Sequence, residues 1–259
     1  MKIFVMGAGH MGSWLAEELC IDNEVAVYDL NREKLKHLRG AKRFLDLPEV
    51  SAFEPELVVN AVSPHKTFDA FRDLLPFLPE NCILSDIASV KTAFFDQYKS
   101  IGMRFVSSHP MFGPTFADRK DLRNENAIII RESDEQGKDF FRKFYQDLGI
   151  RVYEYTFDEH DRRIAYSLSV PFASSMVFAA CMKKQEAPGT TFRKHLDIAR
   201  GLLSEDDHLL AEVMFNPYTI EQIEEISSRL RYLTHIIRAR DYEEIEKFLN
   251  RLRENISQD

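Results

Sequence analysis

The sequence predicts a doubly wound α/β domain over residues 1–155, followed by an all-helical domain over residues 156–259. Two observations carry this prediction. In the first part, short apolar runs alternate with amphipathic helical patterns, which is typical of a parallel sheet covered by helices on both faces. In the second part, strand patterns nearly vanish and apolar residues recur at helical spacing.

The apolar runs of the first part are short and bounded by polar or turn residues, as buried parallel strands should be. Amphipathic helices are expected between them, for example at 66–78 and 134–148. Alternation of this kind also predicts right-handed crossovers. In chain order the predicted strands are Ile3–Met6, Val25–Tyr28, Leu57–Asn60, Ile83–Ser85, Phe105–Val106, Ala127–Arg131 and Val152–Tyr155.

The helical part is expected to open with a capping box, because Glu159 follows Thr156 at the required spacing. Small residues crowd its first helix, which would let another helix approach closely, and Pro171 should kink that helix. The broad apolar stripes of this part exceed what one small domain easily buries. We therefore expect a homodimer formed through residues after 156, since closed two-fold pairing is the commonest soluble assembly.

Composition is that of an ordinary soluble globular protein, with 44% hydrophobic and 29% charged residues. The net charge of −8 argues against non-specific nucleic-acid binding. We expect no apolar run of membrane-spanning length, and residues 1–6 run directly into a strand, which favours a cytoplasmic protein without a membrane partner. Cys20, Cys82 and Cys181 are odd in number and widely spaced, so neither a disulfide framework nor a metal site is expected.

A glycine motif, Gly7-Ala8-Gly9-His10-Met11-Gly12, follows the first strand and opens the first helix. Its glycines suit a tight turn, close approach to a pyrophosphate, and helix–strand packing. Asp29 ends the second strand, where a carboxylate accepts a hydrogen bond from the adenosine ribose and repels a 2′-phosphate. These features predict a Rossmann-type site that prefers NAD to NADP. Arg32 is the one feature that would weaken this preference. Ser63 is expected beside the nicotinamide ribose, whereas His65 suits a solvated loop.

Two further segments follow neighbouring strands: Asp86-Ile87-Ala88-Ser89-Val90-Lys91 and Ser108-His109-Pro110-Met111-Phe112-Gly113-Pro114. A His at a strand end, beside a nicotinamide and near a Ser, can remove a hydroxyl proton while hydride leaves the same carbon. An ordinary imidazole has a pKa of about 6.5, so it is largely neutral and able to act as a base at physiological pH. Alternatively, Ser89 caps the following helix, and Lys91 is a structural or cofactor-proximal charge.

These segments, in this order and spacing, resemble the prephenate/arogenate dehydrogenase family of tyrosine biosynthesis. The resemblance covers nearly the whole chain, strongly through residue 114 and loosely beyond. It implies NAD-dependent oxidative decarboxylation of prephenate to 4-hydroxyphenylpyruvate. His109 would accept the 4-hydroxyl proton, and Ser89 would hydrogen-bond that hydroxyl. The family also implies fusion to, or association with, chorismate mutase.

The resemblance implies further substrate contacts in the helical part. His160 and the Asp that follows it match a family pattern. The family uses an Arg there to clamp the ring carboxylate, at a position that aligns with Gly201, so Arg200 or Arg193 would take its place. These two arginines share one helix face, although Arg193 also suits a surface pair with Asp197. Where the family usually has histidines, this chain has Ser169 and Phe172, which leaves the exact substrate open.

Three alternatives stay open. Arogenate dehydrogenase would run the same chemistry on a substrate with an amino-acid side chain. A reductase of the β-hydroxyacid dehydrogenase type would use a helical-domain Lys as acid/base and would leave Ser89 and His109 without a purpose. A non-catalytic nucleotide-sensing module would not need these two residues either.

Overall fold

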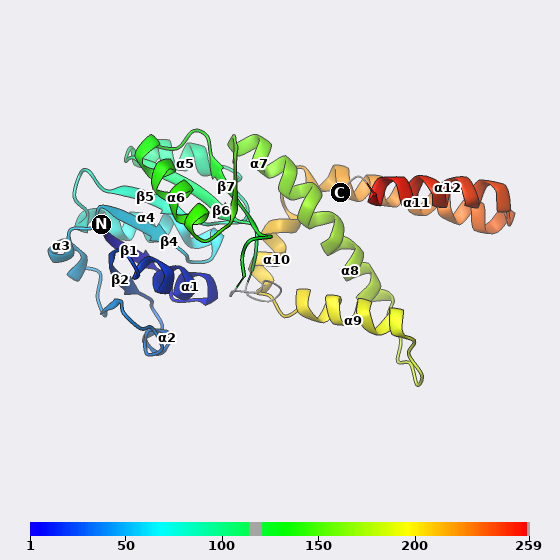
Figure 1. Cartoon of the computed structure of the whole chain (residues 1–259), viewed down its shortest axis with the longest axis horizontal. Helices are drawn as coiled ribbons and strands as arrows, with labels where there is room; N and C mark the ends of the chain where they lie inside the picture. Colours follow the sequence, from blue (N-terminus) through cyan, green and yellow to red (C-terminus); the bar gives the residue numbers. More distant parts are fainter. Residues whose placement is uncertain (114–120, 258–259) are drawn as a thin grey trace.

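The computed structural model describes residues 1–113 and 121–257. An eight-stranded sheet forms the first part, and helices extend from it to one side (Figure 1). The strand order is β3-β2-β1-β4-β5-β6-β7-β8. The bounds are β1 (Lys2–Met6), β2 (Glu24–Tyr28), β3 (Lys42–Phe44), β4 (Leu57–Asn60), β5 (Ile83–Asp86), β6 (Phe105–Pro110), β7 (Asn126–Ile130) and β8 (Arg151–Tyr155).

Alternate residues of the central strands face opposite sides, so the sheet separates two apolar cores. Ile3 and Val5 of β1 pack in one core, whereas Phe4 and Met6 pack in the other. The helices that cover these faces are α1 (His10–Leu19), α2 (Arg32–Leu35), α3 (Glu49–Phe53), α4 (Thr67–Leu74), α5 (Phe94–Ile101) and α6 (Glu135–Asp147). The helix expected at 66–78 is instead α4 flanked by the 3₁₀ turns η1 (Pro64–Lys66) and η2 (Leu75–Phe77).

Strand β6 differs most from the sequence prediction, because it continues through the polar residues Ser107 to Pro110. Its first half pairs in parallel with β5, and its second half pairs antiparallel with β7, with His109 opposite Ile128. The apolar-run criterion stops at Val106 and so misses this extension. It also misses β3, a three-residue strand whose first two residues, Lys42 and Arg43, are exposed.

The helical part confirms the predicted fold class. It comprises α7 (Phe157–Ile164), the π-helical turn η3 (Ala165–Ser169), α8 (Val170–Cys181), α9 (Thr190–Leu202), α10 (Asp207–Met214), α11 (Thr219–Ala239) and α12 (Tyr242–Ile256). The capping box is present: Oγ1 of Thr156 accepts from the Glu159 amide at 3.1 Å, and a Glu159 carboxylate oxygen accepts from the Thr156 amide at 2.9 Å. Helices α11 and α12 pack as a pair that extends away from the sheet (Figure 1).

The expectation about membrane-spanning length is wrong. Helices α7 and α8 are continuous through η3, and the resulting helix Phe157–Cys181 has 25 residues, with a mean hydropathy of 1.5 in its most apolar window. By length and composition alone it could cross a bilayer, and 22% of that window is buried in the chain. Serines interrupt its apolar run in the sequence, so no continuous apolar stretch of that length is evident there. A π-helical turn lies just before Pro171, where a kink is expected.

Candidate active site at the carboxyl edge of the sheet

The glycine motif lies where the strand order reverses between β1 and β4. Gly7 has φ +97°, and a Cβ there would lie 2.8 Å from the Ala61 carbonyl oxygen. A Cβ on Gly12 would lie 2.0 Å from the Gly7 carbonyl oxygen, so this helix–strand approach requires glycine. At Gly9, by contrast, no described atom lies within 4 Å of the position of a Cβ. Two glycines are therefore required by packing, and the third leaves room beside the backbone.

Helix α1 begins at His10, and its N-cap Gly9 has no side chain to satisfy the first N–H groups. Those groups could donate to a pyrophosphate placed over Gly9. Asp29, directly after β2, accepts from the Ala8 amide at 2.7 Å and from the Asn31 amide at 2.8 Å. Each carboxylate oxygen keeps a further lone pair for a ribose hydroxyl. The residues present thus fit a dinucleotide: residues 7–12 would hold its phosphates, and Asp29 its adenosine ribose.

Ser89 lies in the loop after β5 and does not cap the helix that follows. Helix α5 begins at Phe94, and its N-cap is Ala93 in the left-handed conformation, so the capping alternative is wrong. The Ser89 hydroxyl is buried and has no hydrogen-bond partner among the described residues. Leaving a buried hydroxyl unsatisfied costs about 1–3 kcal/mol, so this atom is suited to a ligand that supplies the missing bond.

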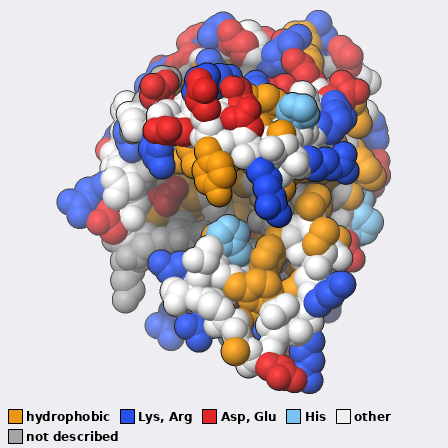
Figure 2. Space-filling model, turned by 90° about the vertical axis from the view of Figure 1, so that its right-hand side faces the viewer, with side chains coloured by type: hydrophobic (Ala, Val, Ile, Leu, Met, Phe, Trp, Pro, Cys, Tyr) orange, Lys and Arg blue, Asp and Glu red, His pale blue; other side chains and the backbone are white. Residues whose placement is uncertain are grey.

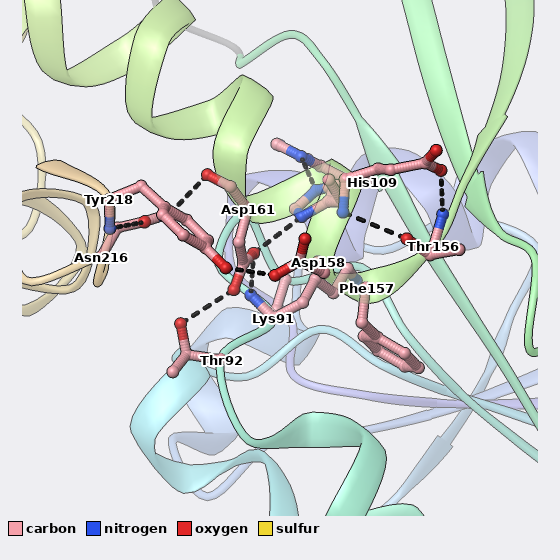
Figure 3. Close-up of polar contacts among 12 residues, drawn as sticks. Lys91, Thr92, His109, Thr156, Phe157, Asp158, Asp161, Asn216 and Tyr218 are labelled. Carbon is pink, nitrogen blue, oxygen red and sulfur yellow. Dashed lines mark hydrogen bonds and ion pairs between the residues drawn. The ribbon is translucent and has the colours of Figure 1, made fainter. Parts of the chain in front are cut away.

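His109 is joined to a chain of buried polar groups from helix α7 (Figure 3). Its Nδ1 lies 3.0 Å from Nε2 of His160, and Nδ1 of His160 lies 2.9 Å from a carboxylate oxygen of Asp161. A carboxylate only accepts hydrogen bonds, so His160 donates from Nδ1 and accepts at Nε2. His109 must then donate from Nδ1. In this neutral arrangement its Nε2 carries a lone pair, and that atom has no hydrogen-bond partner among the described residues.

Asp161 is itself held from three sides. One of its oxygens accepts from the Lys91 amide at 3.0 Å, and the other accepts from the Thr92 hydroxyl at 2.8 Å. Its carbonyl oxygen accepts from the Asn216 side chain at 2.9 Å, which links α7 to the turn before α11 (Figure 3). The carboxylate that orients His160 is therefore fixed by both parts of the chain.

The two imidazoles are arranged to stay neutral. Burial lowers the pKa of His109 well below the ordinary value, and the neighbouring His160 and Lys91 lower it further. Burial also lowers the pKa of His160, although Asp161 opposes this shift. Since desolvation disfavours the charged form of an imidazole, His109 is unprotonated at neutral pH and able to accept a proton.

Comparison with known proteins places these residues in a family. The model of the prephenate dehydrogenase nucleotide-binding domain matches residues 17–153, more than half of the chain, including Asp29, Ser89 and His109. The chain belongs to the prephenate dehydrogenase family. The probable arogenate/prephenate dehydrogenase of Methanocaldococcus jannaschii is 23% identical over 261 residues, which cover 94% of this chain and 58% of that protein. The T-protein of Enterobacter agglomerans is 23% identical over 225 residues, covering 83% of this chain and 56% of that protein.

This member of the family thus spans little more than half the length of these curated relatives. Its fold is that of solved family structures. The prephenate dehydrogenase of Aquifex aeolicus, in complex with hydroxyphenyl propionate and NAD+, aligns with a TM-score of 0.85 and 19% identity, covering 100% of this chain and 98% of that one. The arogenate dehydrogenase of Synechocystis aligns with a TM-score of 0.77 and 18% identity, covering 100% and 99%.

His160 and Lys91, both expected at the site, have fully buried side chains. His160 uses both ring nitrogens within the chain, where it contacts His109 and Asp161. The Lys91 ammonium lies between Asp86 and the Ser108 carbonyl oxygen, which agrees with the structural one of the two expected roles. Sequence spacing does not reveal these partners, because they lie on segments far apart in the chain.

The cation beside Asp29 is not the expected one. The Arg32 guanidinium points toward Asp46 and the Leu45 carbonyl oxygen, both at 3.4 Å. Nζ of Lys34 lies 3.9 Å from the Asp29 carboxylate, and half of its side chain is exposed. Lys34 is therefore the cation nearest this carboxylate in the described part of the chain. The short helix α2 follows the end of β2 and turns the Lys34 side chain back toward Asp29. In the sequence, the only sign of this pairing is that Lys34 lies a few residues after Asp29 in a short helical segment.

The other expected site residues lie on exposed surfaces. Ser63 is exposed before η1, and the exposed His65 stacks on His208 of α10 at a centroid distance of 4.4 Å, so His65 joins the two parts of the chain. Arg193 and Arg200 are exposed on α9, which lies apart from the sheet (Figure 1). Arg200 pairs with Asp197 at 3.6 Å, and among the described residues neither arginine contacts His109 or Ser89. Pro114 lies outside the described residues.

The positions where the family has histidines are structural here. The Ser169 hydroxyl hydrogen-bonds Thr219 at 2.7 Å, which ties η3 to α11. Phe172 packs against a small apolar cluster that also includes Val90, next to Ser89, and Met111, close after His109. One wall beside the candidate site is therefore apolar. The arrangement as a whole can accept a proton at His109, hydrogen-bond a hydroxyl at Ser89, and hold a dinucleotide beside both.

Proposed function

We propose that the chain is an NAD-dependent dehydrogenase that converts prephenate to 4-hydroxyphenylpyruvate and CO2. The observation that carries this proposal is the free lone pair on Nε2 of His109, since His160 engages Nδ1 and Nε2 has no hydrogen-bond partner among the described residues. The Ser89 hydroxyl, also without a partner in the described part of the chain, lies in the loop after the neighbouring strand. A base and a hydroxyl donor at the carboxyl edge of a dinucleotide-binding sheet suit oxidation of a secondary alcohol, whose carbon carries the hydride to be transferred.

Each residue has one task in this proposal. Ser89 hydrogen-bonds the 4-hydroxyl of prephenate and orients it toward His109. Nε2 of His109 accepts the hydroxyl proton as the carbonyl character at C4 develops. NAD, when bound, supplies the acceptor for the hydride that leaves C4. Loss of CO2 from the opposite ring carbon makes the ring aromatic, so orientation and one base are the main requirements on the protein.

Arogenate is the second candidate substrate, because a solved arogenate dehydrogenase shares the fold over nearly all of both chains. The two substrates differ in the side chain that lies opposite the hydroxyl. Arg200 and Arg193 stay candidates for the ring carboxylate, reached from a partner copy or after movement of α9, since both are exposed in the single chain.

We also propose a homodimer through the helical part. Large apolar side chains are exposed on this part, and on the face in Figure 2 hydrophobic side chains gather in and below a central hollow, while charged ones crowd above it. Large contiguous apolar patches on a protein surface usually mark an interaction site. The most exposed large apolar side chains of this part are Tyr166, Phe215, Ile220, Ile237, Tyr242 and Ile256.

The deciding test follows the absorbance of NADH as it forms with prephenate, with arogenate, or with a small β-hydroxyacid as substrate. Mass spectrometry then identifies the product. We expect 4-hydroxyphenylpyruvate from prephenate. Faster turnover of arogenate would assign the second candidate. Turnover of the β-hydroxyacid alone would assign the β-hydroxyacid dehydrogenase alternative, and folded protein that binds NAD+ but turns over none of the three compounds would support the non-catalytic alternative.

A further inference from the structure

Lys91 carries a buried charge that the proposed chemistry does not use. Its side chain has no exposed area, and its ammonium contacts the Asp86 carboxylate and the Ser108 carbonyl oxygen, the latter at 2.7 Å. Asp86 is completed by the Tyr98 hydroxyl at 2.7 Å and the Ala88 amide at 3.0 Å. Burying two charges is expensive, and an apolar pair of similar volume is often as stable. Stability alone therefore does not account for this pair.

The contacts of Lys91 reach both ends of the chain of groups that orients His109. Its ammonium donates to the carbonyl of Ser108, the residue directly before His109 in β6. Its backbone amide donates to the Asp161 oxygen that also accepts from His160. One residue thus contacts the strand that carries the base and the carboxylate that ends the chain. The three segments it joins are β6, α7 and the loop after β5.

We propose that Lys91 is a positioning residue for His109: with Asp86 it fixes the end of β6 against α7, so that Nε2 of His109 faces the site. The role in catalysis rests on the proposed function of His109 as the base. The position of Lys91 does not rest on that function, and neither does its electrostatic effect on His109. The nearest alternative is a purely structural ion pair, and the experiment below separates the two.

The ammonium also acts on the protonation of His109. Among the described residues, this imidazole contacts His160, which is paired with Asp161, and the charge of Lys91, which is paired with Asp86, acts on it. Lys91 is positive and lowers the pKa of both His109 and His160. Removing the charge should therefore raise the proton affinity of His109. A structural pair at another place in the fold would have no such effect.

The test compares neutral and charged replacements. Replacing Lys91 alone by Met would leave Asp86 buried and unpaired, which is strongly destabilising. The main variant is therefore the double replacement Asp86→Asn with Lys91→Met, which removes both charges at similar volume. Lys91→Arg keeps the charge but is larger and planar, so it should disturb the end of β6. Lys138→Met is the matched control, because Lys138 is also nearly buried but contacts Glu135 and the Arg131 carbonyl.

The first readout is the NMR titration of the His109 ring in the ligand-free protein, assigned with His109→Asn. We expect its midpoint to rise in the double variant, by less than the roughly one pH unit that a single lost charge would give, because loss of the Asp86 carboxylate partly offsets loss of the ammonium. The midpoint should stay unchanged in Lys91→Arg and Lys138→Met. This readout needs no turnover, so it stands even if the proposed substrate is wrong.

The second readout is the pH profile of NADH formation. In the double variant the rising limb of kcat/KM should move to higher pH by the same amount, and kcat should fall about 10- to 100-fold with little change in KM. Lys91→Arg should lower kcat without moving the limb. A folded double variant with an unchanged His109 midpoint would overturn the proposal. If the double variant does not fold, Lys91→Arg decides: unchanged kcat would overturn the positioning role.

Discussion

Nδ1 of His109 lies 3.0 Å from Nε2 of His160, so the candidate base is oriented by a second imidazole and, within the described part of the chain, is linked to a carboxylate through it. This relationship determines which nitrogen of His109 carries the proton. It also makes the chemistry sensitive to a group, Asp161, that does not hydrogen-bond His109 in the described structure.

Replacing Asp161 by Leu should release the chain of hydrogen bonds, because His160 loses the acceptor that keeps its proton on Nδ1. His160 can then donate from Nε2 to His109, which leaves the proton of His109 on the nitrogen that should accept. We expect kcat to fall by about 10²–10⁴, the range for a lost general base, with NAD+ affinity unchanged. Thr92→Val is the matched control, since it removes another contact to Asp161. Near-normal kcat in Asp161→Leu would refute the inferred tautomer.

Replacing His109 by Asn should lower kcat by about 10²–10⁴, because it removes basicity and keeps a hydrogen-bonding group. If the base had the pKa of an ordinary imidazole, log(kcat/KM) would rise with pH through about pH 6.5. Burial and Lys91 lower the pKa of His109 well below that value, so we expect the limb at lower pH and a flat profile above it. Ser89→Ala should cost less, since Ser89 only orients the hydroxyl. A limb that persists in His109→Asn would assign the base to another group.

The cofactor preference should be set by Asp29 and Lys34 together. We expect NAD+ to be favoured, Asp29→Ser to narrow the preference, and Lys34→Met to widen it, because the ammonium 3.9 Å from Asp29 offsets part of its repulsion of a 2′-phosphate. Arg32→Met is the control. The single tryptophan, Trp14, is buried in α1, so energy transfer from it to NADH or NADPH measures both affinities. Equal affinities in wild type would contradict the role of Asp29.

Stability should fall on mild acidification. His109 and His160 have lowered pKa values in the folded chain, so below about pH 6.5 the unfolded chain takes up protons that the folded chain does not. The free energy of unfolding should therefore decrease as the pH falls through this window, by at most about 1.4 kcal/mol per pH unit for each histidine. Urea unfolding at several pH values measures the slope. It should become shallower in His109→Asn, and an unchanged slope would contradict the assignment.

Light scattering at micromolar concentration should give a dimer mass. Ile220→Glu, in the helical part, should shift the protein toward monomer, because it places a charge on an apolar surface that a partner would bury. Ile21→Glu is the matched control, since Ile21 is similarly exposed but lies after α1. A monomeric wild type would remove the proposed assembly.

Local pattern was enough to predict the sheet and the glycine motif, and to assign Ser89 and His109 to the ends of two strands, β5 and β6, that are adjacent in the sheet. The glycine motif can be recognised because its function depends on local backbone geometry, such as the positive φ of Gly7. The roles of His160 and Lys91 could not be predicted in the same way. His160 is 51 residues from His109, and its contact depends on the angle at which α7 meets β6. An isolated Lys or His has no pattern that distinguishes a buried support from a ligand contact.

The placement of His109 within β6 has a consequence for how the site can be controlled. The base lies opposite Ile128 in the antiparallel pairing of the end of β6 with β7. Hydrogen exchange at the paired amides should be slow, because exposing them requires β6 and β7 to separate. The base is thus held by backbone pairing on one side and by His160 on the other. We expect control of the base to act from the helical side, through the segments that carry His160, Asp161 and Asn216.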